Sequence, residues 1–171
     1  MNATEALKAA GFKPEKSTVG DKIILKGIYK ATMFKVAEME DKGYGPSIYA
    51  QFKIQEVLSG DTSYSQYPEF AGYFNTAPDK IGNKSNGLAK LINGLFSAGH
   101  EVNTDNVVDS LSALLGSEVY INGYRKEPMR KVEGTEEWEE NPDGVAKQAF
   151  AFMTKDNAEK KAKKNAEAKP F

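Results

Sequence analysis

Alternating apolar and polar positions dominate the first half of the chain. Over residues 48–55, Ile, Ala, Phe and Ile alternate with Tyr, Gln, Lys and Gln, which is the period of two expected for a half-buried strand. A longer β-like run precedes it over residues 21–40, and a third strand is expected over residues 69–75. Residues 41–46 contain two glycines and a proline, so they predict a turn. The pattern therefore indicates three strands, the first two joined as a hairpin.

The period changes to that of a helix after residue 86. Apolar residues then follow at i, i+3, i+4, i+7 and i+8, namely Leu88, Leu91, Ile92, Leu95 and Phe96. Gly99 is placed to end this helix, and a second helix is expected from about residue 105 to Gly116. The strand pattern returns over residues 118–124 and 148–153. The predicted order is three strands, two helices and two strands.

This order predicts the fold class and the domain organisation. Five short antiparallel strands with helices between the third and fourth are typical of the OB-fold, a partly open Greek-key barrel. We therefore expect a mainly β, five-stranded OB-fold barrel with a helical insertion over residues 21–154; an α+β sandwich fits the same periodicity. Residues 1–20 are expected to hold a short helix and a lead-in. Residues 155–171 are expected to be a flexible basic tail, either a frayed helix or disordered, because their alanines offer little to bury.

Composition narrows the possible classes of protein. The 171 residues include no cysteine, which excludes thiol nucleophiles, thiolate zinc sites and disulfides, and fits a reducing compartment. The longest strictly apolar stretch, residues 149–153, is far too short to span a membrane, and the N-terminus lacks the order of a signal peptide. We expect a soluble cytoplasmic protein that does not associate with a membrane.

Catalytic and metal-binding candidates are sparse. The single histidine, His100, follows a helix end, where a histidine is more often a terminal or surface residue than a general base. The glutamates of residues 133–140 lack the spacing of a calcium loop, and residues 82–85 lack the glycine spacing of a phosphate-binding loop. Because the sequence offers no nucleophile and base that could act together, we expect that the protein is not an enzyme and binds no cofactor and no metal. A binding module is the better class.

Charge is distributed unevenly along the chain. Residues 155–171 hold six lysines against three acidic residues, a net charge of +3, whereas residues 1–154 hold 17 basic and 21 acidic residues, a net charge of −4. A nucleic-acid binder more often has a basic surplus. Any nucleic-acid site must therefore rest on a local patch.

Such a patch is predicted on the polar face of the sheet, where rings and lysines interleave. If the apolar residues of 48–55 pack inward, Tyr49 and Lys53 must face the opposite way. Rings can stack on unpaired bases while cations contact the phosphates between them, which is the chemistry that a single strand requires. The same rings could instead close the core or rim of the barrel. The predicted residues for binding single-stranded DNA are Lys30, Phe34, Tyr49, Lys53, Tyr73, Lys84, Tyr124 and Arg125.

Lys84 and the segment after the fourth strand need separate arguments. Lys84 lies in a polar loop that enters the main helix, where backbone amides favour a phosphate; an ordinary solvated loop is the slightly favoured alternative. Lys126, Arg130 and Lys131 could contact a nucleic-acid backbone, whereas the glutamates beyond them would repel it. The only tryptophan, Trp138, could stack on a base; the simpler interpretation is that it fixes its loop to the body of the protein.

The order of these segments resembles that of the small OB-fold single-stranded DNA-binding proteins encoded by bacteriophages. The resemblance covers roughly residues 20–154. It rests on Gly27-Ile28-Tyr29-Lys30, residues 45–54, Phe74-Asn75, the helix over 88–96 and the short second helix before 118–124. It implies sequence-tolerant binding of single-stranded DNA, without catalysis, during phage DNA replication or recombination in the bacterial cytoplasm.

The C-terminus carries a second resemblance. Pro170-Phe171 is similar to the tip with which bacterial single-stranded DNA-binding proteins recruit repair and replication enzymes. Here the tip follows lysines rather than an acidic tail. The resemblance implies phage or host replication and recombination proteins as partners of this tail. The alternative for the whole chain is a non-enzymatic protein-interaction or assembly module on the same barrel, which the acidic body favours.

Overall fold

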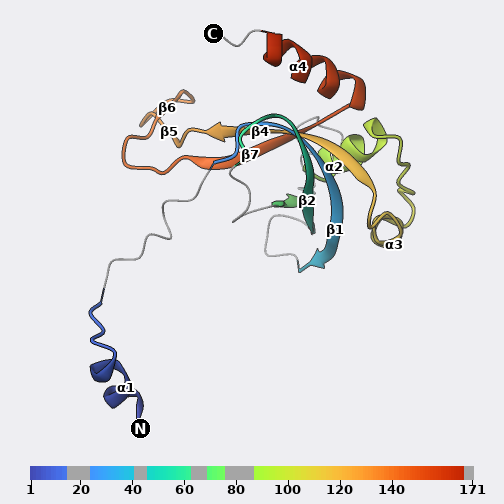
Figure 1. Cartoon of the computed structure of the whole chain (residues 1–171). Coiled ribbons are helices and arrows are strands. Elements are labelled where there is room, and N and C mark those ends of the chain that lie inside the picture. Colours follow the sequence, from blue (N-terminus) through green and yellow to red (C-terminus); the bar gives the residue numbers. More distant parts are fainter. Residues whose placement is uncertain (15–23, 41–45, 63–68, 76–86, 168–171) are drawn as a thin grey trace.

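The computed structural model describes residues 1–14, 24–40, 46–62, 69–75 and 87–167. Within these ranges the chain forms a five-stranded antiparallel sheet, a separate two-stranded ribbon and helices that lie on both faces of the sheet (Figure 1). Lys84, Pro170 and Phe171 lie outside the described residues, so their roles remain predictions.

The main sheet has the order β3-β2-β1-β4-β7, and every neighbouring pair is antiparallel. Its strands are β1 (Gly27–Met39), β2 (Ser47–Gly60), β3 (Glu69–Asn75), β4 (Glu118–Lys126) and β7 (Lys147–Met153). The predicted mainly β domain with helices between its third and fourth strands is thus confirmed. Closure into a barrel is not: β3 and β7 are the two edges of the sheet, and no ladder between described residues joins them.

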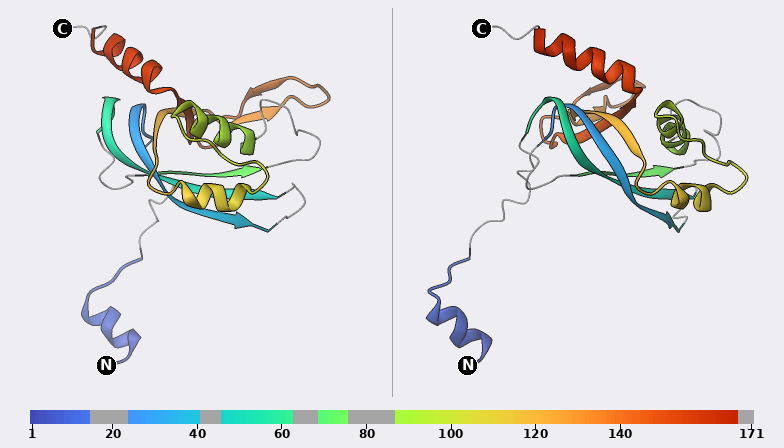
Figure 2. Two further views of the ribbon diagram at one scale, coloured as in Figure 1. Left: turned by 90° about the vertical axis from the view of Figure 1, so that its right-hand side faces the viewer. Right: turned by 45° about the vertical axis from the view of Figure 1, so that its right-hand side comes forward.

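The sheet curves strongly because β1 and β2 are long and their pairing is irregular (Figure 2). The register shifts at three places, the last between Met33 and Lys35, and such bulges bend a strand. At one end of the pair Gly27 lies opposite Gly60, with φ of 154° and 108°. A Cβ on Gly27 would lie 2.2 Å from the Ser59 backbone oxygen, and one on Gly60 would lie 2.2 Å from the Lys26 backbone oxygen, so only glycine fits this corner.

The curvature brings the two edge strands into side-chain contact. Phe70 and Phe74 of β3 meet Phe150 and Phe152 of β7 inside the curve. The ring centroids of Phe70 and Phe150 are 5.4 Å apart, and Phe74 lies 6.3 Å from each of the two β7 rings. Aromatic packing therefore joins the edges where backbone pairing does not.

Helices α2 (Gly87–Ser97) and α3 (Val107–Ala113) pack against the inner face of the sheet, as the apolar stripes predict. Their Leu91, Leu95 and Leu111 are fully buried. At Gly94 the helix approaches β7 so closely that a Cβ would lie 2.3 Å from the ring of Phe152. After the helix ends, His100 Nε2 lies 2.9 Å from the carbonyl oxygen of Glu118 and thereby links this region to the start of β4.

Helix α4 (Lys155–Glu167) packs against the outer face of the sheet, where the sequence predicts a flexible tail. Ala158 is fully buried against Ile28 and Tyr120, and Asn165 Nδ2 donates to Ser59 Oγ at 3.3 Å. The difference has a simple cause: alanine buries little area, but its small side chain lets the helix lie close to the sheet. Helix α4 covers only the end of the outer face formed by these residues.

Two peripheral elements complete the chain. Helix α1 (Ala3–Ala9) confirms the predicted N-terminal helix; it has no buried residue and lies away from the sheet (Figure 1). The segment between β4 and β7 holds a ribbon of β5 (Met129–Lys131) and β6 (Trp138–Glu140), which the sequence did not predict. Every residue of these two short strands is exposed. No helix among the described residues is long and apolar enough to cross a bilayer.

Candidate nucleic-acid interface

A groove of about 650 Å³ lies where the sheet fails to close, between β3, β7 and α2. Its lining includes Tyr73 from β3, Lys90 from α2, Tyr124 and Lys126 from β4, and Lys147 at the start of β7. We call Lys90, Lys126 and Lys147 the groove lysines. Two of the predicted binding residues, Tyr73 and Tyr124, therefore line the same groove, although β2 and β1 lie between their strands in the sheet.

Strand register explains how the chain gathers these side chains. Tyr124 and Lys126 are two residues apart on β4 and so point to the same side. Lys126 pairs directly with Lys147 in the β4–β7 ladder. Like charges directly opposite each other destabilise a strand pair, so an anion between them would relieve the repulsion. This arrangement by itself favours an anionic ligand.

No described carboxylate neutralises the groove lysines. All three are exposed, and none forms an ion pair with a residue that the structure describes. Among the described lining residues there is no aspartate or glutamate. The groove is therefore a local basic patch on a body whose net charge is negative.

The groove lining includes two kinds of ring. Phe74, Phe150 and Phe152 belong to the hydrophobic core or pack against it. Tyr73 and Tyr124 are 65% and 44% exposed. Rings this exposed can stack on a ligand without unpacking the core.

The outer face next to the groove carries a second group of predicted residues. The Tyr49 ring lies 4.9 Å from the Tyr73 ring, centroid to centroid, and Lys35 Nζ lies 5.8 Å from the centroid of Tyr49. Phe34, 41% exposed, is the extra residue at the β1 bulge. Lys53 is exposed and lies opposite Glu69 on β3, at a different level of the same face.

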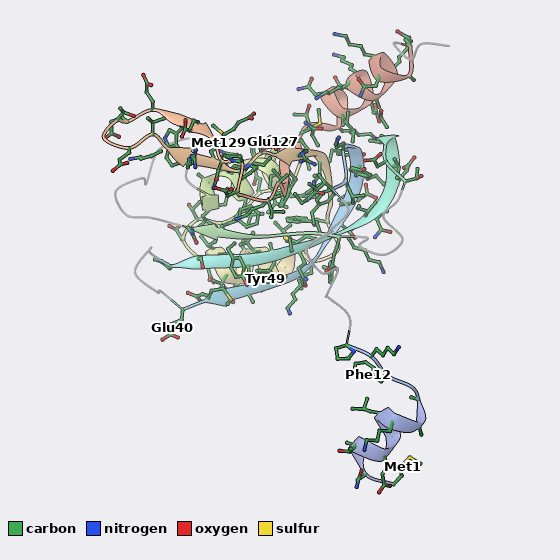
Figure 3. All side chains as sticks on the ribbon, turned by 90° about the vertical axis from the view of Figure 1, so that its left-hand side faces the viewer. Met1, Phe12, Glu40, Tyr49, Glu127 and Met129 are labelled. Atoms are coloured by element: carbon green, nitrogen blue, oxygen red, sulfur yellow. The ribbon has the colours of Figure 1, made fainter. Side chains whose placement is uncertain are left out.

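Two other predicted residues form ion pairs with carboxylates. Lys30 Nζ lies between Glu56 and Glu118, at 3.6 and 3.7 Å from their oxygens. Arg125 is ion-paired with Glu127 and lines a different hollow at the base of the ribbon. Figure 3 shows that Glu127 lies well apart from Tyr49. The structure therefore does not bring Lys30 and Arg125 to the groove.

Trp138 does not fix the ribbon to the body, so the simpler sequence interpretation is wrong. Its side chain is 60% exposed, and Lys131 Nζ lies 5.7 Å from its ring centroid. Trp138 pairs with Lys131 across the ribbon, and its neighbours along the chain are glutamates. The ring is available to a ligand, but the surrounding charge opposes a phosphate.

Tyr29 is the one described group with a clearly shifted pKa, and it lies outside the groove. Its hydroxyl donates to the carbonyl oxygen of Asp61 at 2.9 Å. Burial, together with the nearby Asp61 carboxylate, raises the pKa of Tyr29 to about 12. The ring is fully buried, so this tyrosine is a neutral core residue. Among the described residues, no cluster of three or more histidine, aspartate or glutamate side chains could hold a metal ion.

Sequence reasoning missed Lys90 and Lys147 as site residues and left Lys126 as a minor candidate. A signal for two of them was present: Lys126 and Lys147 flank the excursion between the last two predicted strands. If those strands pair as antiparallel neighbours, the residues that flank their connection lie opposite each other. Lys90 carries no such signal, because its place at the groove depends on how α2 packs across the opening between β3 and β7.

Comparison with protein-family models finds none that matches this chain, and comparison with curated proteins finds no matching relative.

Proposed function

We propose that the protein binds single-stranded DNA in the groove between β3 and β7, without strong sequence preference, during phage DNA replication or recombination. The observation that carries the proposal is the direct pairing of Lys126 with Lys147, which lack a described carboxylate partner and lie beside two exposed tyrosines. The phage setting rests on the resemblance in the sequence alone.

The two kinds of side chain divide the work. The groove lysines attract phosphates and release their counterions, a term that does not depend on base sequence. Tyr73 and Tyr124 offer faces on which unpaired bases stack, each contributing about 1–3 kcal/mol. In a duplex the bases are already stacked and paired, so only the phosphate contacts remain. The groove should therefore prefer single strands.

We further propose that the sheet is an OB-fold barrel left open along one seam. An order of β3-β2-β1-β4-β7, with two helices between the third and fourth strands of the sheet, is what a five-stranded barrel would give if its third and last strands did not pair. The proposed site then lies in that seam.

The unpaired edges also favour a second candidate function. An extended peptide can add to the free edge of a strand through backbone hydrogen bonds. β3 and β7 each pair on one side only in the described sheet, and the groove lysines would select an acidic peptide. Binding of an acidic peptide at these edges would make the protein the protein-interaction or assembly module that the sequence offers as the alternative.

The proposal is tested by fluorescence anisotropy with labelled oligo-dT of about 20 nucleotides, which exceeds the roughly 4–16 nucleotides that one OB-fold covers. We expect oligo-dT to bind more tightly than a duplex of equal length. Log affinity should fall against log salt with a slope of about −2 to −4, at about −0.7 for each phosphate neutralised. Duplex bound as tightly as oligo-dT would contradict the proposal.

The groove is tested by replacing the groove lysines with glutamine. Loss of three phosphate contacts should make the slope shallower by about 2 and weaken binding about a hundredfold at 0.1 M salt. The matched control replaces three exposed lysines elsewhere, Lys8, Lys13 and Lys26, and should keep the parent affinity. Equal losses in the two triple variants would show that net charge, and not the groove, governs binding.

A further inference from the structure

Tyr73 belongs to two surfaces at once. It is part of the groove lining at the β3 edge, and its ring meets that of Tyr49 on the outer face, with the centroids 4.9 Å apart. Tyr49 and Tyr73 are direct partners in the β2–β3 ladder, so the contact is fixed by strand register. The groove and the outer face are therefore continuous at this residue.

The outer face continues as a row across the strands. From Tyr73 on β3 the row passes to Tyr49 on β2 and to Lys35 on β1, whose Nζ lies 5.8 Å from the Tyr49 centroid. Neighbouring strands lie about 4.8 Å apart, so the row extends roughly 10 Å beyond the groove. Phe34, exposed at the bulge beside Lys35, adds a ring at its far end.

The positions of charged side chains and of α4 indicate which part of the outer face a DNA strand can follow. Lys35 forms no ion pair with a residue that the structure describes. On the same face, Glu69 lies opposite Lys53 and accepts from Gln51 Nε2 at 3.3 Å, so an amide of the ladder partner of Lys35 already engages this carboxylate. The other end of β1 is closed to phosphate, because Glu56 and Glu118 flank Lys30 and α4 packs beside Ile28.

We propose that the bound DNA strand crosses the β3 edge at Tyr73 and continues over the outer face along Tyr49 and Lys35. This proposal rests on the proposed function and adds a second subsite to it. Bases stack on Tyr73 and Tyr49 as the strand turns over the edge, and Lys35 contacts a phosphate beyond them. An oligonucleotide must then exceed a minimum length before it reaches the second subsite.

The test is a series of oligo-dT lengths from about 4 to about 16 nucleotides, the range of single OB-fold sites, measured on the full chain. Three variants are compared with the parent: Lys35→Gln, Tyr49→Val, and Lys26→Gln as a matched control at an exposed lysine just before β1, outside the groove and the row. Thermal melting checks that each variant is folded. Lys35→Gln keeps the test decisive if Tyr49→Val melts early, because the Lys35 side chain is exposed.

We expect the shortest bound oligonucleotides to bind all three variants as they bind the parent. The longer ones should bind Lys35→Gln about fivefold more weakly at 0.1 M salt, which corresponds to one lost phosphate contact. Tyr49→Val should lose about fivefold or more, and Lys26→Gln should lose nothing.

The outcomes separate this inference from the function on which it rests. No loss at any length, or an equal loss at every length, would confine the strand to the groove and overturn the second subsite while the proposed function stands. A parent protein that binds no oligo-dT of any length would overturn the proposed function itself.

Discussion

Arg125 and Lys126 are neighbours at the end of β4, yet they open onto two different hollows. Lys126 faces the groove, of about 650 Å³, together with the other groove lysines. Arg125 faces a hollow of about 500 Å³ at the base of the ribbon, which is also lined by Glu127, Arg130 and Glu140. The two hollows are similar in volume, but they differ in whether their cations are paired with carboxylates.

The difference lies in pairing. At the ribbon, Arg125 is held by Glu127, and Arg130 Nε lies 2.8 Å from a Glu139 oxygen. Exposed pairs of this kind add little stability, but an incoming phosphate must compete with the carboxylates. In the groove no described carboxylate competes. Counting cations along a sequence therefore does not locate an anion site; the side of the strand and the nearest acid decide it.

Crowding a glycine in each hollow should give the largest contrast. A Cβ at Gly94 would lie 2.3 Å from the Phe152 ring, and one at Gly144 would lie 2.4 Å from Pro128. We expect Gly94→Ala to cost about 1–3 kcal/mol, by pushing α2 away from β7, and to weaken oligo-dT binding as the groove distorts. Thermal melting and anisotropy measure both effects. Gly144→Ala should leave the affinity intact, and an equal loss in both variants would break the comparison.

Charge reversal at the two neighbouring residues tests the comparison more directly. Lys126→Glu should weaken oligo-dT binding tenfold or more at 0.1 M salt, since it removes one phosphate contact and adds repulsion. Arg125→Glu makes the same change of charge one residue away and should stay within about twofold, because Arg125 is already paired with Glu127. A larger loss in Arg125→Glu would move the site to the ribbon.

The smallest expected effect is at the ribbon, where we expect DNA binding to leave the tryptophan fluorescence unchanged. Trp138 is the only tryptophan and is exposed, so its emission reports contacts at the ribbon. With DNA held in the groove, saturating oligo-dT should leave the wavelength and intensity of that emission unchanged. Quenching that saturates in step with binding would place DNA on Trp138 and refute the contrast between the hollows.

The fold was predictable where apolar residues repeat. The period of two predicted β1 to β4 and β7, and the leucine stripe predicted α2. The ribbon was missed, because two three-residue strands bury nothing and leave no periodic pattern. Helix α4 was expected to stay flexible, because the fit of Ala158 between Ile28 and Tyr120 depends on shape rather than on hydrophobicity.

The candidate site was predictable only in part, for a related reason. Alternation along a strand gave the outward rings Tyr49 and Tyr73, but it could not tell that Lys30 lies between two glutamates contributed by other strands. Nor could it tell which edges of the sheet meet. Pairing across strands and the curvature that brings β3 to β7 are properties of the folded chain.

The open seam also bears on how copies of this chain behave toward one another. A free strand edge is a template on which another chain can pair, and proteins often guard such edges with lysine. Lys147 opens the edge strand β7, and Lys126 lies opposite it, so a second copy docking along this edge would have to bury their charge. The side chains proposed to attract DNA therefore also oppose edge-to-edge aggregation, and selection for tighter or weaker binding would alter both properties together.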